Sequence, residues 1–355
     1  MTRSSLTSNM KGKIMPQWHA YRAIETNDEP PVVVSSWQLV DDTCLPAIGT
    51  LKGEGEVLIK VQYSSVNYKD ALSASGNRGV TRNFPHTPGI DAAGTVVSDA
   101  SGQFTEGAEV LVFGYDLGMN TAGGYGEFIR VPASWVLIKP GELSFADAMR
   151  WGTAGFTAAL SVEKLLKADI KPDAGKIIVT GATGGVGSVA VALLSKLGFE
   201  VVAVTGKAAA KDWLLNIGAS EVLDRADLLP MAKKPMTRPL YQAGIDTCGG
   251  DMIAAVLPQL NYGGALTTCG MVAGADFSVS VFPFIIRGID LLGVDSVEIS
   301  QTHKQLLIKK VADEWQLSTL TDFTKTIGRS ELPAVLLDVL AGKGQGRYLL
   351  DLAKA

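Results

Sequence analysis

Four glycines fall within seven residues of the stretch VTGATGGVGSVAVALLSKLG, which covers residues 179–198. They are Gly181, Gly184, Gly185 and Gly187, and they separate a short apolar run from a segment with the pattern of a helix. Glycine lets a chain turn tightly and approach an anion closely. The free amides at a helix start, together with the helix dipole, then hold that anion. The stretch therefore predicts a site for a dinucleotide pyrophosphate, although a tight strand–helix connection without a ligand remains the alternative.

The end of the next apolar segment, 200–204, bears on which dinucleotide binds. In a site for NAD, an Asp or Glu at this point bonds the ribose 2′-hydroxyl, and that carboxylate would repel a 2′-phosphate. Here Thr205, Gly206 and Lys207 follow the segment, so the position offers a hydroxyl, close backbone approach and a cation. We therefore expect NADPH. Arg225 either adds a second charge or stacks on the adenine, while a solvated lysine is the alternative for Lys207.

Two kinds of element must position these residues. The first 140 residues are rich in Gly and Pro and contain short alternating segments, such as 56–66, 94–98 and 108–114, which predict a β-rich, partly closed sheet. From Lys176 onward, continuous apolar strands alternate with amphipathic helices, a pattern typical of a parallel sheet covered on both faces. The predicted fold class is α/β, with a β-rich domain and a Rossmann domain that has a doubly wound parallel sheet. Ser144, with Asp147 three residues later, is a plausible N-cap where the pattern changes.

The length of 355 residues favours two domains. We expect the Rossmann domain over 148–300. The other domain should cover 16–147 and be completed by 301–355, which returns as a helix and a short strand. Residues 1–15 are polar and lack the apolar core of a secretory signal, so we expect a flexible leader or an extended start there.

Composition excludes several classes of protein. Hydrophobic residues make up 46% of the chain and charged residues 19%, as in a compact protein with ample core. The net charge of −4 argues against nucleic acid or an anionic membrane surface as the main partner. No apolar stretch reaches about twenty residues, so no spanning helix is expected. Three widely separated cysteines argue against a disulfide framework and for a reducing cytoplasm.

The combination of these domains raises the possibility of a zinc alcohol dehydrogenase. Catalytic zinc needs clustered Cys and His or a carboxylate, and structural zinc needs four closely spaced cysteines. His19, His86 and His303 are not near a cysteine, and Gly89-Ile90-Asp91 stands where zinc enzymes carry Gly-His-Glu. We therefore expect no metal site. Without a Lewis acid, reduction of a polarised C=C bond or a quinone is simpler chemistry than alcohol oxidation.

Several stretches resemble the medium-chain dehydrogenase/reductase superfamily, and within it the YhdH/YhfP quinone oxidoreductase branch, which contains the acrylyl-CoA reductases. Besides the glycine stretch, they are SSVNYKDAL (64–72), RNFPHTPGIDAAGTV (82–96), GTAGFTA (152–158), NYGG (261–264) and GVDSV (293–297). The similarity runs from about Tyr21 to the end. It implies a GroES-like catalytic domain, an NADPH-binding Rossmann domain, a cleft between the two and usually a homodimer.

The same resemblance places the NADPH contacts on residues from several segments. They are Tyr68, Thr183, Gly184, Gly185, Val186, Thr205, Gly206, Lys207, Arg225, Met271, Ile285 and Ser296. Relatives have Ser and Arg in place of Thr205 and Lys207, so this chain keeps the hydroxyl and the charge but loses the planar fork that suits phosphate. Gly342 stands where the family has an Asn contact.

The reaction implied by the resemblance is hydride transfer from NADPH to the β-carbon of an enoyl thioester, with acrylyl-CoA as the family-level substrate. The developing enolate oxygen needs a donor, and the α-carbon then takes a proton. Tyr68 is the best candidate because a phenol can donate. Asn67 could orient the substrate, and Asp70 either takes part or only fixes the loop. The same NYKD residues also fit a polar strand-to-helix cap.

Substrate capture is assigned to two arginines. Coenzyme A carries several phosphates, so Arg78 and Arg82 could bind it near the cleft mouth, although solvated arginines are equally common on surfaces. Tyr125 could line the pocket, whereas Phe282 and Phe284 favour core packing. Two other functions stay open: an NADPH:quinone or general α,β-unsaturated carbonyl reductase, and a non-catalytic NADPH-binding protein with a structural or redox-sensing role.

Overall fold

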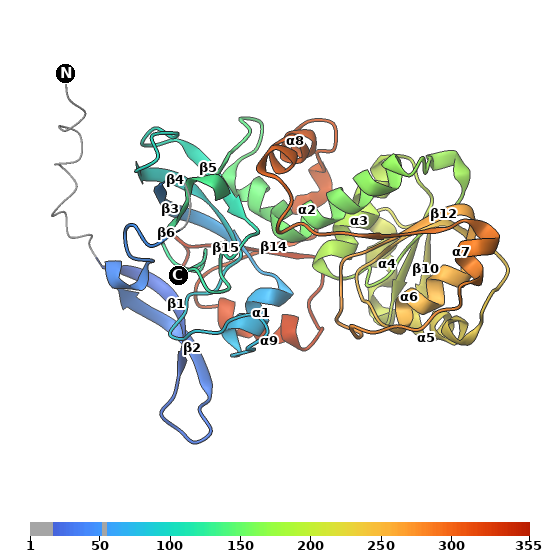
Figure 1. The fold of residues 1–355 in the computed structure, drawn as a ribbon, viewed down its shortest axis with the longest axis horizontal. Coiled ribbons are helices and arrows are strands. Elements are labelled where there is room, and N and C mark those ends of the chain that lie inside the picture. Colours follow the sequence, from blue (N-terminus) through green and yellow to red (C-terminus); the bar gives the residue numbers. More distant parts are fainter. Residues whose placement is uncertain (1–16, 52–54) are drawn as a thin grey trace.

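The computed structural model describes residues 17–51 and 55–355, and the expected leader lies outside these residues. Two large sheets lie at opposite ends of an elongated molecule, and the helix α2 (Phe145–Lys167) runs between them (Figure 1). We call the two ends the β-rich half and the parallel-sheet half. This arrangement confirms the predicted fold class, a GroES-like half together with a doubly wound parallel sheet.

The parallel-sheet half contains six strands in the order β10-β9-β8-β11-β12-β13. Their bounds are β8 (Ile177–Val179), β9 (Val201–Thr205), β10 (Glu221–Asp224), β11 (Tyr241–Asp246), β12 (Leu260–Thr268) and β13 (Asp290–Gly293). Every neighbouring pair is parallel. The chain therefore runs outward first in one direction from β8 and then in the other from β11. Ligands of such sheets bind at the carboxyl ends of the strands beside this switch point.

Helices cover both faces of this sheet. Their bounds are α3 (Gly185–Lys196), α4 (Lys211–Asn216), α5 (Arg225–Leu228), α6 (Asp251–Val256) and α7 (Phe282–Arg287). The helix α8 (Gln301–Ala312) packs instead on α2 and on β7 (Leu137–Ile138) of the β-rich half. Ile177 and Val179 pack into one apolar cluster with α2 and α3, whereas Ile178 packs into another with α6. Because successive strand residues point to opposite faces, an unbroken apolar strand is what a sheet covered on both sides requires.

The β-rich half is a sheet of seven strands in the order β14-β15-β3-β4-β5-β7, with β6 also paired to β3. Their bounds are β3 (Glu56–Ser65), β4 (Asp91–Asp99), β5 (Glu109–Phe113), β6 (Phe128–Pro132), β7 (Leu137–Ile138), β14 (Thr324–Ile327) and β15 (Arg347–Asp351). The C-terminal strand β15 lies antiparallel to β3, with Leu349 opposite Ser65. The tail therefore returns to the first sheet. The domain boundaries at residues 147 and 300 stay a prediction.

Two helices and a hairpin complete this half. They are α1 (Tyr68–Ala74), α9 (Leu332–Leu340), and the antiparallel strands β1 (Trp18–Glu25) and β2 (Val33–Val40). At the start of α2 the Ser144 hydroxyl accepts a hydrogen bond from the Asp147 amide at 3.0 Å, which confirms the predicted cap. Among the described residues, no helix combines the length and the hydropathy needed to cross a bilayer.

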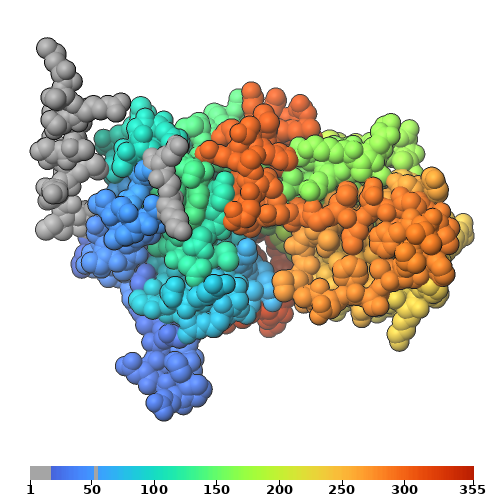
Figure 2. Space-filling model, in the orientation of Figure 1, coloured from blue at the N-terminus to red at the C-terminus, as the bar shows by residue number. Residues whose placement is uncertain are grey.

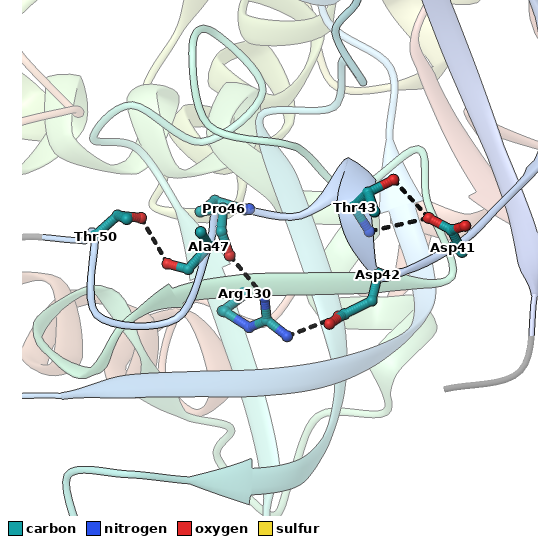
Figure 3. A network of polar contacts seen from close by, with 7 residues as sticks. All are labelled: Asp41, Asp42, Thr43, Pro46, Ala47, Thr50 and Arg130. Atoms are coloured by element: carbon teal, nitrogen blue, oxygen red, sulfur yellow. Dashed lines mark hydrogen bonds and ion pairs between the residues drawn. The ribbon is translucent and has the colours of Figure 1, made fainter. Parts of the chain in front are cut away.

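A polar network holds residues 41–50, which follow β2, against Arg130 (Figure 3). The buried Arg130 guanidinium donates to the Pro46 carbonyl at 2.6 Å and to Asp42 Oδ1 at 2.8 Å. Asp41 caps the short turn of 3-10 helix that follows, because its Oδ1 accepts from the Thr43 amide at 3.0 Å. The network holds one wall of a hollow of about 240 Å³, lined also by Arg22 and His86. None of the predicted site residues lines this hollow.

Candidate cofactor and active site

The glycine stretch forms the turn between β8 and α3. Gly181 has a φ of +61°, a conformation that other residues rarely adopt. A Cβ at Gly187 would lie 2.3 Å from the Gly181 carbonyl oxygen, so close packing of the turn on the helix requires glycine there as well. Gly184 is the N-cap of α3 and has no side chain to occupy the helix start. The first amides of α3 are therefore left for an external acceptor, at the switch point of the sheet.

The end of β9 forms a cationic corner from Gly206, Lys207 and Arg225. The Arg225 guanidinium lies directly over Gly206, where an added Cβ would be 3.0 Å from Nη2 and 3.1 Å from Cζ. Lys207 Nζ donates to the Gly344 carbonyl at 2.5 Å, and its amide donates to Thr205 Oγ1 at 3.1 Å. Burial lowers the pKa of Lys207. This corner has two positive groups around a bare stretch of backbone, as a phosphate monoester requires.

An acid does lie near this corner, at the end of the neighbouring strand. Asp224 is opposite Thr205 in the register of β10 and β9. Its carboxylate accepts from the Ala226 amide at 2.7 Å and thereby caps α5. Asp224 is therefore engaged in starting its own helix, and the strand that normally carries the ribose-binding acid ends in Thr205.

An open groove of about 630 Å³ lies at the carboxyl ends of β12 and β13. It is lined by Lys164, Thr268, Cys269, Gly270, Met271, Gly293, Val294, Asp295 and Ile299. Met271 was predicted to contact the cofactor, and Ser296 directly follows the groove residue Asp295. Ser296 Oγ is 2.8 Å from Thr157 Oγ1 on α2, which fixes that hydroxyl at the edge of the groove. Ile285 is 68% exposed on α7 and is not among the lining residues.

Tyr68, Asn67 and Asp70 meet at the start of α1. Asn67 is the N-cap, and its amide donates to Asp70 Oδ2 at 2.9 Å, so the strand-to-helix cap is present. Asp70 also accepts from the Ile90 amide at 2.8 Å and is fully buried. Tyr68, in contrast, is 39% exposed. Of the three, only Tyr68 presents a large polar side chain to solvent.

A second buried carboxylate lies beside Asp70. The Asn67 side-chain amide donates to Asp91 Oδ2 at 2.9 Å and to Asp70 Oδ2 at 3.1 Å, so one amide bridges the two acids. Asp91 also accepts from the Thr153 amide at 2.9 Å and from the Ser65 hydroxyl. Burial, and then the Asp91 charge, raise the pKa of Asp70 to about 7. Near neutral pH this site therefore holds or releases a proton.

Gly152 allows this cluster to form. It interrupts α2 with a φ of +48°, and a Cβ there would lie 2.6 Å from Ser65 Oγ and 2.7 Å from Asp91 Oδ2. The bend turns the Thr153 amide and hydroxyl onto Asp91. The GTAGFTA stretch therefore supplies both the space and the donors that keep a buried carboxylate in place.

Arg347 belongs to the same cluster, although it was not among the predicted site residues. It is 1% exposed, and it donates from Nε to the Arg150 carbonyl at 2.9 Å and from Nη1 to Asn67 Oδ1 at 3.3 Å. A Cβ at Gly185 would lie 2.9 Å from Nη1, and the neighbouring Gly346 amide donates to the Thr183 carbonyl at 3.0 Å. Arg347 thus joins the glycine turn to the acids behind α1. Its only sequence signal is a cation between Gly346 and an apolar strand.

The other candidates lie elsewhere. Arg78 forms an ion pair with Glu25 and donates from Nη1 to the Arg82 carbonyl at 2.6 Å, so its charge is already matched. Neither Arg78 nor Arg82 lines the groove. Tyr125 is fully buried and donates to the Ser65 carbonyl at 3.2 Å, so it supports the cluster and does not line a pocket. Within residues 17–51 and 55–355, no three His, Cys, Asp or Glu side chains are grouped as a metal site would need.

A pH dependence follows from the raised pKa of Asp70. Between about pH 4 and pH 7 the folded chain keeps a proton that the unfolded chain has released, so the free energy of unfolding falls as the pH rises. The loss is about 1.4 kcal/mol for each unit by which the pKa is raised. The difference in the free energy of unfolding between the native chain and Asp70→Asn, measured in urea across this range, should show that slope, because His86, whose pKa burial lowers to about 4, contributes an opposite slope equally to both. The exposed Asp173→Asn is the control, and an unchanged slope in Asp70→Asn would contradict the assignment.

Comparison with known proteins agrees with this geometry. Residues 53–141 match the family model of the alcohol dehydrogenase GroES-like domain, and residues 185–313 match that of the zinc-binding dehydrogenases. YhfP of Bacillus subtilis, whose name describes a quinone oxidoreductase, is 41% identical over 83% of this chain and 90% of its own length. Acrylyl-CoA reductase AcuI of Ruegeria pomeroyi is 38% identical over 84% of this chain and 90% of its own.

Solved structures show the same relationship. The yhdH oxidoreductase of Salmonella enterica, crystallised with NADP, is 36% identical with a TM-score of 0.88 over 94% of this chain and 99% of that one. YhfP, crystallised with NAD, is 37% identical with a TM-score of 0.89 over 95% of this chain and 100% of that one. The chain therefore belongs to the medium-chain dehydrogenase/reductase superfamily, in the branch that contains YhfP and the acrylyl-CoA reductases.

Proposed function

We propose that this chain is an NADPH-dependent reductase of activated C=C bonds, with acrylyl-CoA as its substrate. NADPH, when bound, supplies the hydride that goes to the β-carbon of the enoyl thioester. The observation that carries the choice of cofactor is the corner at the end of β9, where Arg225 covers Gly206 and Lys207 lies alongside. One relative was crystallised with NADP and another with NAD, so similarity to relatives does not by itself decide the cofactor. The residues of this corner support NADPH.

The residues present fit the dinucleotide. The glycine turn would hold the pyrophosphate through Thr183, Gly184, Gly185 and Val186, because a side chain at Gly185 or Gly187 would meet neighbouring atoms at under 3 Å. Thr205, Gly206, Lys207 and Arg225 would hold the 2′-phosphate. Met271 and Ser296, at the groove, would contact the nicotinamide half, with Ile285 nearby on α7.

The substrate carbonyl needs a donor, and Tyr68 is the side chain we assign to it. It stands at the first turn of α1, where it is partly exposed while Asp70 is buried and bonded to the Asn67 amide. We therefore assign Tyr68 to the reacting atoms, and Asn67 and Asp70 to holding the start of α1. Arg78 and Arg82 remain our candidates for the coenzyme A phosphates, with Arg82 the freer of the two because Arg78 pairs with Glu25.

The substrate class is tested by steady-state oxidation of NADPH with acrylyl-CoA beside simple quinones. We expect the larger kcat/KM with acrylyl-CoA. A quinone preference of about tenfold, equal to 1.4 kcal/mol in transition-state binding, would favour an NADPH:quinone reductase. Saturable NADPH binding without turnover of either would favour a structural or redox-sensing protein.

Tyr68→Phe separates binding from turnover. It removes one hydroxyl and keeps the ring, so NADPH affinity should stay within about twofold while kcat for acrylyl-CoA falls about 10²-fold or more, the usual size of an acid–base contribution. Fluorescence titration gives the affinity, and stopped-flow turnover gives kcat. Tyr63→Phe, a change on β3, is the matched control. An unchanged kcat in Tyr68→Phe would remove Tyr68 from the reaction.

We also propose a cytoplasmic homodimer. The strand β13 is at the edge of the parallel sheet, and α7, which precedes it in the chain and packs on β12, exposes Phe282, Ile285 and Ile286 at 45%, 68% and 57%. An unpaired strand edge next to exposed apolar side chains is a surface that a second copy can cover. All three cysteines are free thiols, the state that a reducing compartment maintains. Light scattering on the purified chain tests the dimer.

A further inference from the structure

Lys304 on α8 is buried without a carboxylate partner among the described residues. It is 0% exposed, a rare state for a lysine. Its Nζ donates to the Val297 carbonyl at 2.6 Å and to the Phe113 carbonyl at 3.3 Å, and lies 3.4 Å from the centroid of the Tyr115 ring. The ammonium is therefore held by two carbonyl dipoles and one aromatic face, each of which favours a cation.

The backbone around Lys304 is shaped to receive it. Gly114 has a φ of +84°, and a Cβ there would lie 2.7 Å from Lys304 Nζ. Tyr115 also has a positive φ, +53°, which costs free energy in a residue other than glycine. Its ring stacks on Trp135 with centroids 5.3 Å apart. Two consecutive residues thus adopt unusual conformations that wrap the chain around one ammonium group.

Lys304 connects the two halves of the molecule at the groove. Phe113 ends β5 of the β-rich half, whereas Val297 belongs to the loop that follows β13 of the parallel sheet. That loop, residues 294–299, supplies Asp295 to the groove and Ser296 to the hydrogen bond with Thr157. In Figures 1 and 2 the segment from this loop into α8 lies where the two halves meet.

We propose that Lys304 is a positioning residue, which as a cation holds the 294–299 loop, and with it Ser296, in the place that receives the nicotinamide half of NADPH. This inference rests on the proposed function. Lys304 contacts neither the groove nor the reacting atoms, so its effect passes through Val297 to the neighbouring Ser296. Removing the charge should weaken NADPH binding and leave the chemistry of the bound complex nearly unchanged.

The loss of the Lys304 charge at alkaline pH should change the affinity for NADPH. Burial lowers the pKa of Lys304 to about 8, while the carboxylates of Glu298 and Asp295 oppose this shift. Above about pH 8 the neutral amine loses its attraction to the Tyr115 ring and its charge-assisted bonds, so NADPH affinity should fall. Because the folded pKa lies below the unfolded value, Lys304 makes the free energy of unfolding rise over the same range. The titration of Lys304 therefore does not itself destabilise the fold over this range.

The test compares Lys304→Met with Lys304→Arg. Fluorescence titration with NADPH from about pH 6.5 to 9.5 should show about tenfold weaker binding in Lys304→Met near neutral pH, the value of one charge-assisted hydrogen bond. That variant should also lose the fall above pH 8. Lys304→Arg keeps a charge at every pH in this range and should restore most of the affinity without the alkaline fall. The exposed Lys309→Met on the same helix is the matched control.

The outcomes separate this inference from the proposed function. No saturable binding of NADPH to the native chain would contradict the proposed function. Native binding with the same affinity and pH profile in Lys304→Met would overturn the positioning role alone, as would a failure of Lys304→Arg to restore affinity. If both variants unfold, the test is the pH dependence of NADPH affinity in the native chain. An affinity that stays constant across pH 8 would overturn the positioning role of Lys304.

Discussion

Arg347→Met should lower the free energy of unfolding by about 3–5 kcal/mol, the usual effect of removing one partner from a buried ion cluster. The guanidinium is 1% exposed and lies beside two buried carboxylates, Asp70 and Asp91. Without it, Asn67 loses a donor and the acids lose the nearest cation. Urea unfolding near pH 7 measures the change. The variant should also bind NADPH more weakly, since Arg347 lies against Gly185 in the glycine turn.

Arg329 is the control for Arg347, because it also lies beside a carboxylate but closer to the surface. Arg329 pairs with Glu127 at 3.4 Å near the surface, so Arg329→Met should cost no more than about 1 kcal/mol. Asp91→Asn, combined with Arg347→Met, should recover part of the lost stability because the unpaired charge is then gone as well. Equal losses in the two arginine variants, or no recovery in the double variant, would show that Arg347 does not balance the buried acids.

Periodicity predicted the fold because burial on two faces leaves a clear pattern. The strands expected at 56–66 and 108–114 are β3 and β5, and the helix expected after the four glycines is α3. The unbroken apolar strands of the parallel half have to be covered on both sides, and glycines at the first strand–helix turn mark its switch point. The N-cap at Ser144 was also predictable, because it depends only on residues within one helical turn.

The site was only partly predictable because its decisive contacts are between residues distant in sequence. Lys207 bonds to Gly344, a separation of 137 residues, and Arg347 bonds to Asn67 across 280. Neither pair leaves a periodic or motif signal. Residue type also did not reveal which charges are already matched: Arg78 looked suited to phosphate but pairs with Glu25. Lys304 on α8 could not be distinguished from exposed lysines such as Lys309 before the helix was packed.

Asp70 shows how a helix cap can also become a group that titrates near neutral pH. Its carboxylate caps α1, as Asn and Asp often do, and in doing so becomes buried next to Asp91. Burial then moves the pKa into the neutral range, which capping at an exposed helix start would not do. The capping motif at Asn67 and Asp70 was visible in the sequence. The second carboxylate, Asp91, is 21 residues further along the chain, and only the pairing of β3 with β4 places it beside Asp70.

Lys207→Glu should change the preference for the phosphorylated coenzyme most. The substitution replaces a cation by a carboxylate at the corner where Arg225 covers Gly206, so a 2′-phosphate loses one charge-assisted contact and meets a like charge. NADPH affinity should fall by about 10²-fold or more, while NADH affinity should change by less than about threefold. Fluorescence titration with both coenzymes gives the ratio.

The matched control for this change is Lys211→Glu, which makes the same charge reversal at an exposed position on α4 four residues later. General electrostatic repulsion would weaken NADPH binding in both variants, whereas a specific phosphate corner responds only to position 207. Parallel loss of NADPH and NADH in Lys207→Glu would mean that the corner is not the 2′-phosphate site. Arg225→Met then separates its two roles, since a stacking arginine supports both coenzymes and a phosphate-binding one supports only NADPH.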